Sequence, residues 1–509
     1  MFHPVPILHR DSIDPTRRIT VAPMNDYCIA SGYRHRVDPA YTEDTADSRV
    51  VWQPDVYATA AVLADRYGAA TIIDIGCGGA KKLGLLAGRF SVVGIDYGSN
   101  IDYCRATYPF GRWLAVDMDG EEAPALAEAL RSLGPEILAG AVVVCSDVIE
   151  HLVQPDGLLK VLAGIAPAVR ACVISTPERE RTHHPGHAGP PPNPCHVREW
   201  TLAEFRALLD RFGLPVMYAG LTASHNRGRP KNTILTVIDR NARTAATALQ
   251  ERPVTAVLVA RDDAEHVEGL VGRLHADGIR IHAIDLGSTD GTHELLVGQS
   301  AKLATLERIA TPRVADDGKL DSFWHHVEDV AMSCPGHWML LLEGNQRAAP
   351  TGFGPSLRAA LAGVEASGFN AVSFTGLDFH PVDGGFSRAL DTEAYFGICS
   401  FARSTASRHL TRAWIQPDSH LVGLADTGGC APLFIGRRDF PYRFLMKSYP
   451  KRRFLPEDPW LPARIAHNAT WGFPPGGLEL IDFHQPDFMD RHLTECVFGV
   501  GVLRHDFGL

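Results

Sequence analysis

The stretch Thr71-Ile-Ile-Asp-Ile-Gly-Cys-Gly-Gly-Ala80 decides the fold of the first half of the chain. Its short, β-branched start, closed by glycines, predicts a buried strand. Asp74 stands at the end of this strand, and a glycine-rich turn and a helical pattern follow. A strand, a glycine turn and a helix in this order allow a ligand to approach backbone N–H groups at a helix N-terminus. The stretch therefore predicts an α/β fold with a ligand-binding turn.

The glycine spacing separates two classes of cofactor. A dinucleotide fingerprint has glycine at its first, third and sixth positions, but the sixth position counted from Gly76 is Lys81. This excludes the dinucleotide interpretation and, with it, NAD-dependent oxidation. An acid at the strand end followed by Gly-x-Gly suits a ligand with a cationic amino-acid portion and no pyrophosphate. Asp74, Gly76, Cys77 and Gly78 therefore predict S-adenosylmethionine (SAM) as the ligand.

Acids also end or follow the next strand-like runs. Asp96 ends the run that begins at Ser91, about 20 residues after Gly76, where an acid accepts hydrogen bonds from the ribose hydroxyls. Asp117 follows another strand-like run, and its loop is expected to face the adenine ring. A fourth run ends at Ser146, just before Asp147. Acids and polar groups at neighbouring strand ends predict one binding edge.

These segments together resemble class I SAM-dependent methyltransferases over residues 51–240. The resemblance is carried by Asp-x-Gly-x-Gly, Gly-x-Asp, Val-Asp-Met and Ser-Asp-Val-Ile-Glu-His-Leu, in that order and at βαβ spacing. It implies a Rossmann-like, seven-stranded sheet. The cofactor-binding residues that it implies are Asp74, Gly76, Cys77, Gly78, Asp96, Asp117 and Ser146.

Three polar residues follow the fourth strand, close to the expected position of the methyl group. An oxygen nucleophile usually needs a base in methyl transfer, and Asp147, Glu150 and His151 are the candidates. His151 matches a residue common in the Glu-His-Leu variant of the family. An equally weighted alternative is that His151 is a structural histidine bonded to nearby backbone.

A Pro- and His-rich loop, residues 176–200, follows the fifth strand. Its Asn-Pro-x-His-Val-Arg-Glu-Trp portion resembles a segment of methyltransferases associated with surface-glycan genes. The length and the prolines predict a semi-rigid lid over the acceptor site, where Arg179, His196, Arg198 and Glu199 would meet a polar acceptor such as a sugar hydroxyl. The alternative is that Arg198 and Glu199 anchor the loop.

The same loop contains several potential metal ligands. Zinc sites usually need spaced ligands on a tight framework, which a Pro-rich loop does not provide. The sequence therefore predicts no metal site here. The residues concerned are His183, His184, His187, Cys195 and His196.

A second βαβ pattern begins at Val254, with strands predicted over residues 254–260 and 279–285 and a helix over 264–276. With the turn Gly-Ser-Thr-Asp-Gly-Thr at 287–292, it resembles the nucleotide-binding half of family 2 glycosyltransferases of the GT-A type, over roughly residues 253–460. In that family, acids at strand ends hold the uracil and ribose of a nucleotide sugar. The resemblance implies that Asp262, Asp263, Asp285, Asp290, Glu343 and Asn345 form the nucleotide-sugar site.

The second half departs from that family where a metal would bind. Glu343 and Asn345 occupy the positions of an Asp-x-Asp motif, and the histidines of two later segments are replaced by Cys430 and Ser448. Mg²⁺ and Mn²⁺ prefer carboxylate oxygens, so these replacements make a divalent metal doubtful. The domain either transfers a sugar with little or no metal or only binds a glycan or nucleotide sugar.

The whole chain sets the outer limits. Its 509 residues exceed one ordinary domain; we expect an irregular extension (1–50), the methyltransferase domain (51–240), a linker (241–252) and the GT-A-like domain (253–509). The net charge of −10 disfavours nucleic-acid binding. Ten cysteines without a Cys-x-x-Cys motif suggest free thiols in a reducing cytoplasm. No apolar run is long enough to span a bilayer. The oligomeric state is not indicated.

The leading hypothesis is a cytoplasmic SAM-dependent methyltransferase that methylates an oxygen of a sugar or polysaccharide intermediate in surface-glycan biosynthesis. Its second domain would transfer or bind a nucleotide sugar. One alternative is a small-molecule methyltransferase with an inert second domain. Another is that the second domain recruits the glycan substrate or a partner enzyme.

Overall fold

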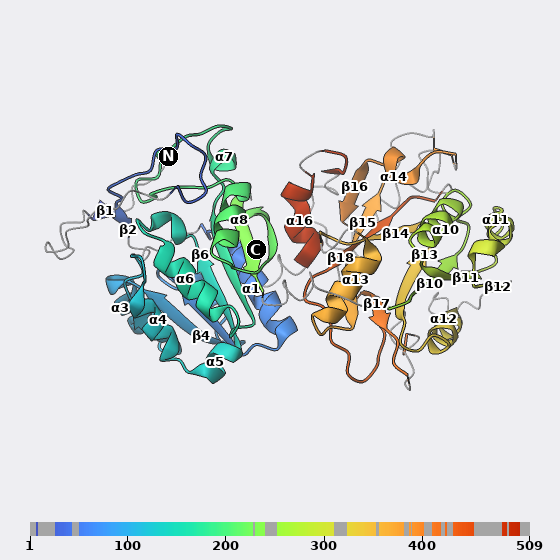
Figure 1. Cartoon of the computed structure of the whole chain (residues 1–509), viewed down its shortest axis with the longest axis horizontal. Helices are drawn as coiled ribbons and strands as arrows, with labels where there is room; N and C mark the ends of the chain where they lie inside the picture. Colours follow the sequence, from blue (N-terminus) through green and yellow to red (C-terminus); the bar gives the residue numbers. More distant parts are fainter. Residues whose placement is uncertain are drawn as a thin grey trace. The chain divides into compact units, whose positions relative to one another are not determined.

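The computed structural model (Figure 1) describes residues 7–8, 26–42, 50–227, 230–239, 252–309, 323–352, 356–380, 386–387, 389–401, 410–418, 423–424, 431–451, 481–485 and 488–498. Residues 241–251 of the predicted linker and most of the predicted N-terminal extension lie outside this set. The chain divides between residues 243 and 244 into two compact units, which are described separately.

The first unit is built on a seven-stranded sheet in the order β5-β4-β3-β6-β7-β9-β8. The strands β3 to β7 are parallel, and β8 and β9 complete the sheet in antiparallel pairs. This confirms the predicted Rossmann-like sheet. Its strands are β3 (Thr71–Ile75), β4 (Ser91–Asp96), β5 (Arg112–Ala115), β6 (Ala141–Ser146), β7 (Ala171–Pro177), β8 (Val216–Ala223) and β9 (Lys231–Ile238).

The strand order creates one reversal point. The chain runs outward from β3 to β5 and then returns to β6, which pairs with the other side of β3. In open α/β sheets, ligands bind beyond the carboxyl ends of the strands at such a switch point. The ends of β3 and β6 therefore mark the expected site.

Helices cover both faces of this sheet. Apolar side chains of β3 and β6 pack with α4, α6 and α8 in one core, and Figure 1 shows α4 and α6 lying over the strands. Ile73 and Ile75 point into that core, and Asp74, between them in the strand, points to the other face of the sheet. Because Tyr57 of α1 contacts Asp74, α1 lies on that other face. The helices are α1 (Pro54–Tyr67), α2 (Lys81–Gly84), α3 (Gly98–Thr107), α4 (Pro124–Arg131), α5 (Pro135–Ala139), η2 (Ile149–His151), α6 (Asp156–Ile165), α7 (Arg179–Thr182) and α8 (Leu202–Arg211); β1 (Ile7–Leu8) and β2 (Tyr41–Thr42) pair separately.

The second unit has a mixed sheet in the order β12-β11-β10-β13-β17-β15-β16-β19, with β14 and β18 joined to it through β15. The strands β10 to β13 are parallel neighbours, and the βαβ start predicted from Val254 is present. Its strands are β10 (Val254–Ala260), β11 (Arg280–Asp285), β12 (Thr305–Arg308), β13 (Trp338–Glu343), β14 (Gln346–Ala349), β15 (Ala371–Phe379), β16 (Ile398–Phe401), β17 (Thr411–Ile415), β18 (Phe444–Ser448) and β19 (Ile481–Asp482).

The helices of the second unit are α10 (Val267–Ala276), α11 (Thr292–Gly298), η3 (Ser300–Lys302), α12 (Phe323–Met332), α13 (Leu357–Ala366), α14 (Thr392–Tyr395) and α16 (Phe488–Phe498). Apolar residues of β10, β11 and β13 pack with α12 in one core. Across the described parts of both units, no helix is both long and apolar enough to cross a bilayer.

Candidate functional site

Asp74 lies fully buried near the end of β3. The Tyr57 hydroxyl donates a hydrogen bond of 2.7 Å to its Oδ2, whereas Oδ1 has no hydrogen-bond partner among the described residues. Burial raises the pKa of Asp74 to about 7, against the lowering effects of the Tyr57 hydrogen bond and the Lys82 charge. A buried carboxylate without a full set of partners favours a cationic ligand.

The turn after β3 requires glycine for two reasons. Gly76 has φ +81°, and a Cβ there would lie 2.2 Å from Cγ2 of Val148, which follows β6. Gly78 has φ +52°, and its N–H donates a 2.7 Å hydrogen bond to Oδ2 of Asp96. The backbone at the switch point is therefore closely packed and has no room for a side chain.

Asp96 ends β4 beside this turn. Its Oδ1 accepts hydrogen bonds from the Asn100 side chain at 3.0 Å and from the Tyr97 N–H at 2.6 Å. Its charge contributes to the raised pKa of Asp74, which places the two carboxylates in one electrostatic environment. The predicted pair of acids is thus brought together across the glycine turn.

The other predicted cofactor residues lie around this turn in different settings. Cys77 is buried, with its Sγ 3.7 Å from the Gly78 carbonyl. Ser146 is buried at the end of β6, and its hydroxyl lies 3.0 Å from that of Ser175. Asp117 is exposed and accepts a 3.1 Å hydrogen bond from the Asp119 N–H.

Asp147 follows β6 with φ +52°, a backbone conformation that costs a non-glycine residue of order 1–3 kcal/mol. Ser175 donates a 3.0 Å hydrogen bond to its Oδ1, and the side-chain amide of Gln53 donates to its Oδ2. Gln53, just before α1, also has positive φ. Burial raises the pKa of Asp147. Two residues with strained backbones that bond to each other at the carboxyl end of β6 are typical of a functional site.

Lys82 lies close to these carboxylates, although no sequence pattern singled it out. Its ammonium lies 4.6 Å from the ring centroid of Tyr57, and its charge lowers the pKa of both Asp74 and Asp147. Gln53 and Tyr57 were also missed. Their only signal was their position at the start of a helix that leads into the first strand.

Glu150 and His151 lie in η2, the turn after Asp147. Glu150 is fully buried; Thr176 donates a 2.9 Å hydrogen bond to its Oε2, and Oε1 has no partner among the described residues. Burial raises the pKa of Glu150. Nδ1 of His151 is 2.9 Å from the Cys195 carbonyl. Because a carbonyl only accepts, Nδ1 carries the hydrogen and Nε2 keeps its lone pair. Burial lowers the pKa of His151 to about 3, so the ring is neutral.

His196 joins this group from the loop. Its Nδ1 is 2.6 Å from Oε1 of Glu199 and its Nε2 is 2.9 Å from the Asn193 side-chain nitrogen. The Asn193 side-chain oxygen accepts from the Cys195 N–H, so its amide donates to Nε2 of His196. One ligand atom from each of Glu150, His151 and His196 lies within 4.8 Å of the others. One carboxylate and two imidazoles are a donor set suited to a divalent transition metal, but Nε2 of His196 becomes available only if the Asn193 amide moves away from it.

The remaining loop residues anchor the loop. Arg198 is fully buried and donates hydrogen bonds of 3.0 and 2.9 Å to the Leu152 and Val153 carbonyls. Arg179 forms a 2.8 Å ion pair with Glu204. Glu199 accepts from His196 and also from His183, at 2.6 Å each; these bonds outweigh burial and lower its pKa. Of the four residues predicted to meet an acceptor, His196 joins the Glu150–His151 group, and the other three hold the loop in place.

Residues 26–42 lie along the same loop. The backbone N–H groups of Arg34, Arg36 and Ala40 donate hydrogen bonds of 2.8–2.9 Å to loop carbonyls. The Tyr33 hydroxyl accepts a hydrogen bond from the Glu199 N–H at 3.0 Å. The N-terminal segment therefore fixes the loop that covers this edge, although no sequence pattern indicated this role.

In the second unit, four predicted acids follow the ends of β10 and β11. Asp263 is buried and forms a 2.9 Å ion pair with Lys451; burial raises its pKa to about 6. Asp285 is buried, 3.2 Å from Nε of Arg308. Asp290 accepts a hydrogen bond from the Thr292 N–H at 3.0 Å, and Asp262 accepts one from the Thr289 N–H at 2.9 Å.

The predicted metal positions of the second unit do not form a ligand cluster. Glu343 is exposed at the end of β13, and the Asn345 side chain donates a 2.7 Å hydrogen bond to the Tyr449 carbonyl. Among the residues described, the only group of three or more close His, Cys, Asp or Glu ligands is the one in the first unit. Cys430 lies outside the described residues.

Comparison with known proteins gives matches only among solved structures: no family model and no curated protein matches. The methyltransferase domain of bacterial CtHen1-CN is 18% identical, with 37% of this chain and 98% of that chain covered and a TM-score of 0.27. A SAM-dependent methyltransferase from Aquifex aeolicus is 15% identical, covering 37% and 89%, with a TM-score of 0.25. The plantazolicin methyltransferase BpumL was solved with SAH (S-adenosylhomocysteine, the demethylated product of SAM). It is 13% identical, with 37% of this chain and 85% of that chain covered and a TM-score of 0.27. At these TM-scores the likeness adds nothing to what the strand order shows.

Proposed function

We propose that the first unit, centred on residues 51–240, is a SAM-dependent methyltransferase. The observation that carries the proposal is Asp74, a buried carboxylate with an unpaired oxygen at the switch point of the sheet. A ligand with an ammonium and a sulfonium group supplies the positive charge that this carboxylate lacks.

The neighbouring residues fit the rest of the same cofactor. The turn at Gly76 packs closely against Val148, the Gly78 N–H holds the Asp96 carboxylate, and Asp96 stands where an acid accepts from ribose hydroxyls. Asp117 and Ser146 flank this edge. When bound, SAM supplies an electrophilic methyl group, and the protein has to align an acceptor with it and exclude water. The anchored loop over Glu150 and His151 serves both tasks.

The acceptor that we propose is a hydroxyl group of a sugar or polysaccharide intermediate. Asp147, Glu150 and His151 are the candidates to take the proton that the hydroxyl loses. Burial raises the pKa of the two carboxyl groups and lowers that of His151 to about 3, so the carboxylates are the stronger bases. The alternative acceptor is another small molecule, with a second unit that only binds a glycan or recruits a partner.

The geometry of Glu150, His151 and His196 also supports a second candidate role, the binding of a divalent cation. Glu150, His151 and His196 offer three ligand atoms within 4.8 Å, and the Glu199 carboxylate orients His196 as carboxylates orient metal-bound histidines. A bound divalent cation would polarise the acceptor hydroxyl in place of a protein base. Metal analysis of the purified protein separates these uses: a stoichiometric metal that disappears in His196→Ala supports the cation, and metal-free active protein supports the base.

Ligand affinity is expected to depend on pH through Asp74. Its pKa of about 7 leaves the carboxyl mostly protonated at pH 6, and a cationic ligand needs the ionised form. Binding then releases a proton, and affinity for SAH rises about eightfold between pH 6 and pH 7.5. Calorimetric titration at both pH values measures this. In Asp74→Asn the affinity should be weaker and flat with pH; a wild-type affinity that does not change with pH would contradict the assignment.

We propose further that the second unit, residues 253–509, binds a nucleotide sugar at the edge formed by β10, β11 and β13. Buried acids at the carboxyl ends of parallel strands, Asp263 and Asp285, support this proposal. Glu343 and Asn345 offer little to a hard cation, so sugar transfer would proceed with little or no metal. Titration with UDP- and GDP-linked sugars, with and without Mn²⁺, tests it. With the methyltransferase unit, such binding would place the protein in surface-glycan biosynthesis.

A further inference from the structure

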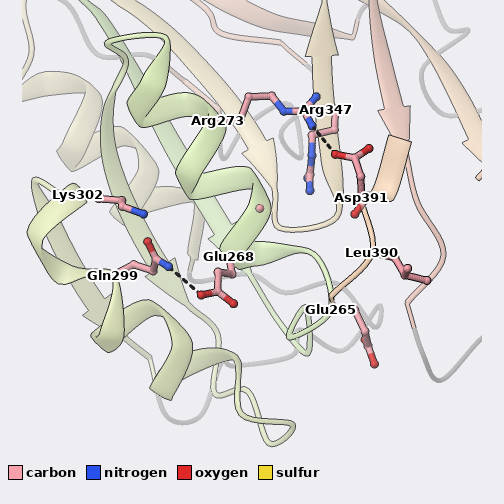
Figure 2. Close-up of a pocket in the computed structure, with 10 residues that line it drawn as sticks. Glu265, Glu268, Arg273, Gln299, Lys302, Arg347, Leu390 and Asp391 are labelled. Atoms are coloured by element: carbon pink, nitrogen blue, oxygen red, sulfur yellow. Dashed lines mark hydrogen bonds and ion pairs between the residues drawn. The ribbon is translucent and has the colours of Figure 1, made fainter. Parts of the chain in front are cut away.

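The second unit contains a cavity of about 280 Å³ that is separate from its row of strand-end acids. It lies against α10, η3, β14 and the start of α14 (Figure 2). Its volume is just below the roughly 300–1,000 Å³ of pockets for drug-sized ligands, so it suits a single sugar ring better than a nucleotide sugar. The polar side chains in its wall are those of Glu265, Glu268, Arg273, Gln299, Lys302, Arg347, Asp391 and Thr392.

Arg347 is the most informative of these residues. Its side chain is 3% exposed, and its two terminal nitrogens donate hydrogen bonds only to backbone carbonyls, those of Gln346 at 2.9 Å and His266 at 3.0 Å. Its Nε has no partner, and none of the described carboxylates forms an ion pair with it. Burial lowers the pKa of Arg347 to about 10, which leaves it charged at neutral pH. The charges of Glu393 and Asp391 act on Arg347 without a direct contact, and a buried cation without a direct ion pair is costly unless a ligand supplies one.

The rest of the wall adds a second cation and several hydrogen-bond acceptors. Lys302 forms no ion pair with any described residue, whereas Arg273 is paired with Glu393 and lies 3.8 Å from Asp391. Gln299 donates a 3.1 Å hydrogen bond to Glu268, and its own buried Oε1 has no partner within the described residues. Among the described residues, neither Arg347 nor Lys302 has a direct ion-pair partner, although the wall itself contains acidic side chains. Oε1 of Gln299 lacks a hydrogen-bond donor.

A glycine keeps the cavity open. Gly269 is inside α10, where glycine costs about 1 kcal/mol relative to alanine, and it lines the cavity. Figure 2 shows Gln299 and Lys302 on one side of the cavity and Arg347 and Asp391 on the other. A Cβ at Gly269 would meet only the Arg347 guanidinium, at 3.9 Å, an ordinary contact. Without a side chain at Gly269, this part of the cavity stays open.

We infer that this cavity binds a monosaccharide that carries a negative charge, with its anionic group at Arg347 and its hydroxyls at Lys302, Gln299 and Glu268 on the other side. The anionic group is a carboxylate, as in a uronic acid, or a phosphate, as in a sugar phosphate. The inference does not depend on nucleotide-sugar binding at the strand-end acids.

The inference is tested by calorimetric titration of the full-length protein with glucuronate, galacturonate, glucose 1-phosphate, mannose 1-phosphate, glucose and inorganic phosphate. At least one of the four charged sugars is expected to bind at least tenfold more tightly than glucose and than phosphate. Whether uronates or sugar phosphates bind identifies the anionic group. Absence of binding by all four, or phosphate binding as tight as the best charged sugar, would overturn the inference.

Two variants locate the binding. Gly269→Gln fills the cavity without removing a contact and should lower the affinity at least tenfold, and Lys302→Gln should lower it several-fold. Gly272→Ala, in the same helix with open space around its Cβ, is the matched control and should bind as wild type. Unchanged affinity in Gly269→Gln, with folding verified by circular dichroism, would show that the sugar binds elsewhere and overturn the inference.

Discussion

Gly76→Ala is expected to abolish SAH binding and to destabilise the first unit by about 2–4 kcal/mol. The new Cβ would lie 2.2 Å from Cγ2 of Val148, and the residue would have to keep φ +81°. Both effects act on the junction of β3 and β6, where the cofactor is proposed to lie against the backbone. Calorimetric titration with SAH and thermal unfolding measure the two consequences.

Gly88→Ala separates steric overlap from backbone strain. Gly88 has φ +89° and nothing within 4 Å of a built Cβ, so alanine there carries only the backbone cost of about 1–2 kcal/mol. SAH affinity should remain that of the wild type. If Gly76→Ala bound SAH as tightly as Gly88→Ala, the turn at Gly76 would not be part of the cofactor site.

Asp96→Asn is expected to weaken SAH binding about a hundredfold. Two charge-assisted hydrogen bonds from ribose hydroxyls, at about 1.5 kcal/mol each, account for this loss. The amide nitrogen of asparagine cannot accept a hydrogen bond, so the 2.7 Å bond from the Gly78 N–H to Oδ2 of Asp96 is also lost. The measurement is again the dissociation constant for SAH.

Asp102→Asn is the matched control for this substitution. Asp102 lies in α3 close in sequence to Asp96, and within the part of the chain that the structure describes its exposed carboxylate pairs only with Arg105. Exposed pairs contribute little, so cofactor affinity and folding should be unchanged. A loss of affinity in both variants would indicate that net charge, and not ribose recognition, is responsible.

The sequence predicted what is local to the chain. Asp74, Gly76 and Asp96 were found because a strand, a turn and a helix leave a pattern within about 25 residues, and the order of such patterns predicted the sheet. The ends of parallel strands meet at one edge, so residues on β3, β4 and β6 could be grouped without coordinates.

What could not be predicted depends on contacts between distant segments. Gln53 and Tyr57 reach Asp147 and Asp74 only because α1 packs across the sheet. The segment around Arg34 and Arg36 has no periodicity, since its backbone bonds with an irregular loop rather than with a strand. In the second unit, the partner of Asp263 is Lys451, far along the chain.

The roles of the charged loop residues could not be predicted from the sequence either. Arg198 and Glu199 were candidates for acceptor contact because charged residues in a lid are often functional. In the structure Arg198 is buried, and its guanidinium donates hydrogen bonds to two backbone carbonyls instead. Whether a charged side chain faces a ligand or its own backbone depends on the packed loop, and no single-sequence pattern reports it.

The most direct test of the central claim is equilibrium titration of the purified full-length protein with SAH at pH 7.5. A single site per chain with a dissociation constant in the micromolar range, weakened about a hundredfold in Asp96→Asn, is the predicted result. Absence of binding at millimolar SAH by folded protein, or equal affinity in the two proteins, would contradict the claim that the carboxylates beside the glycine turn hold this cofactor.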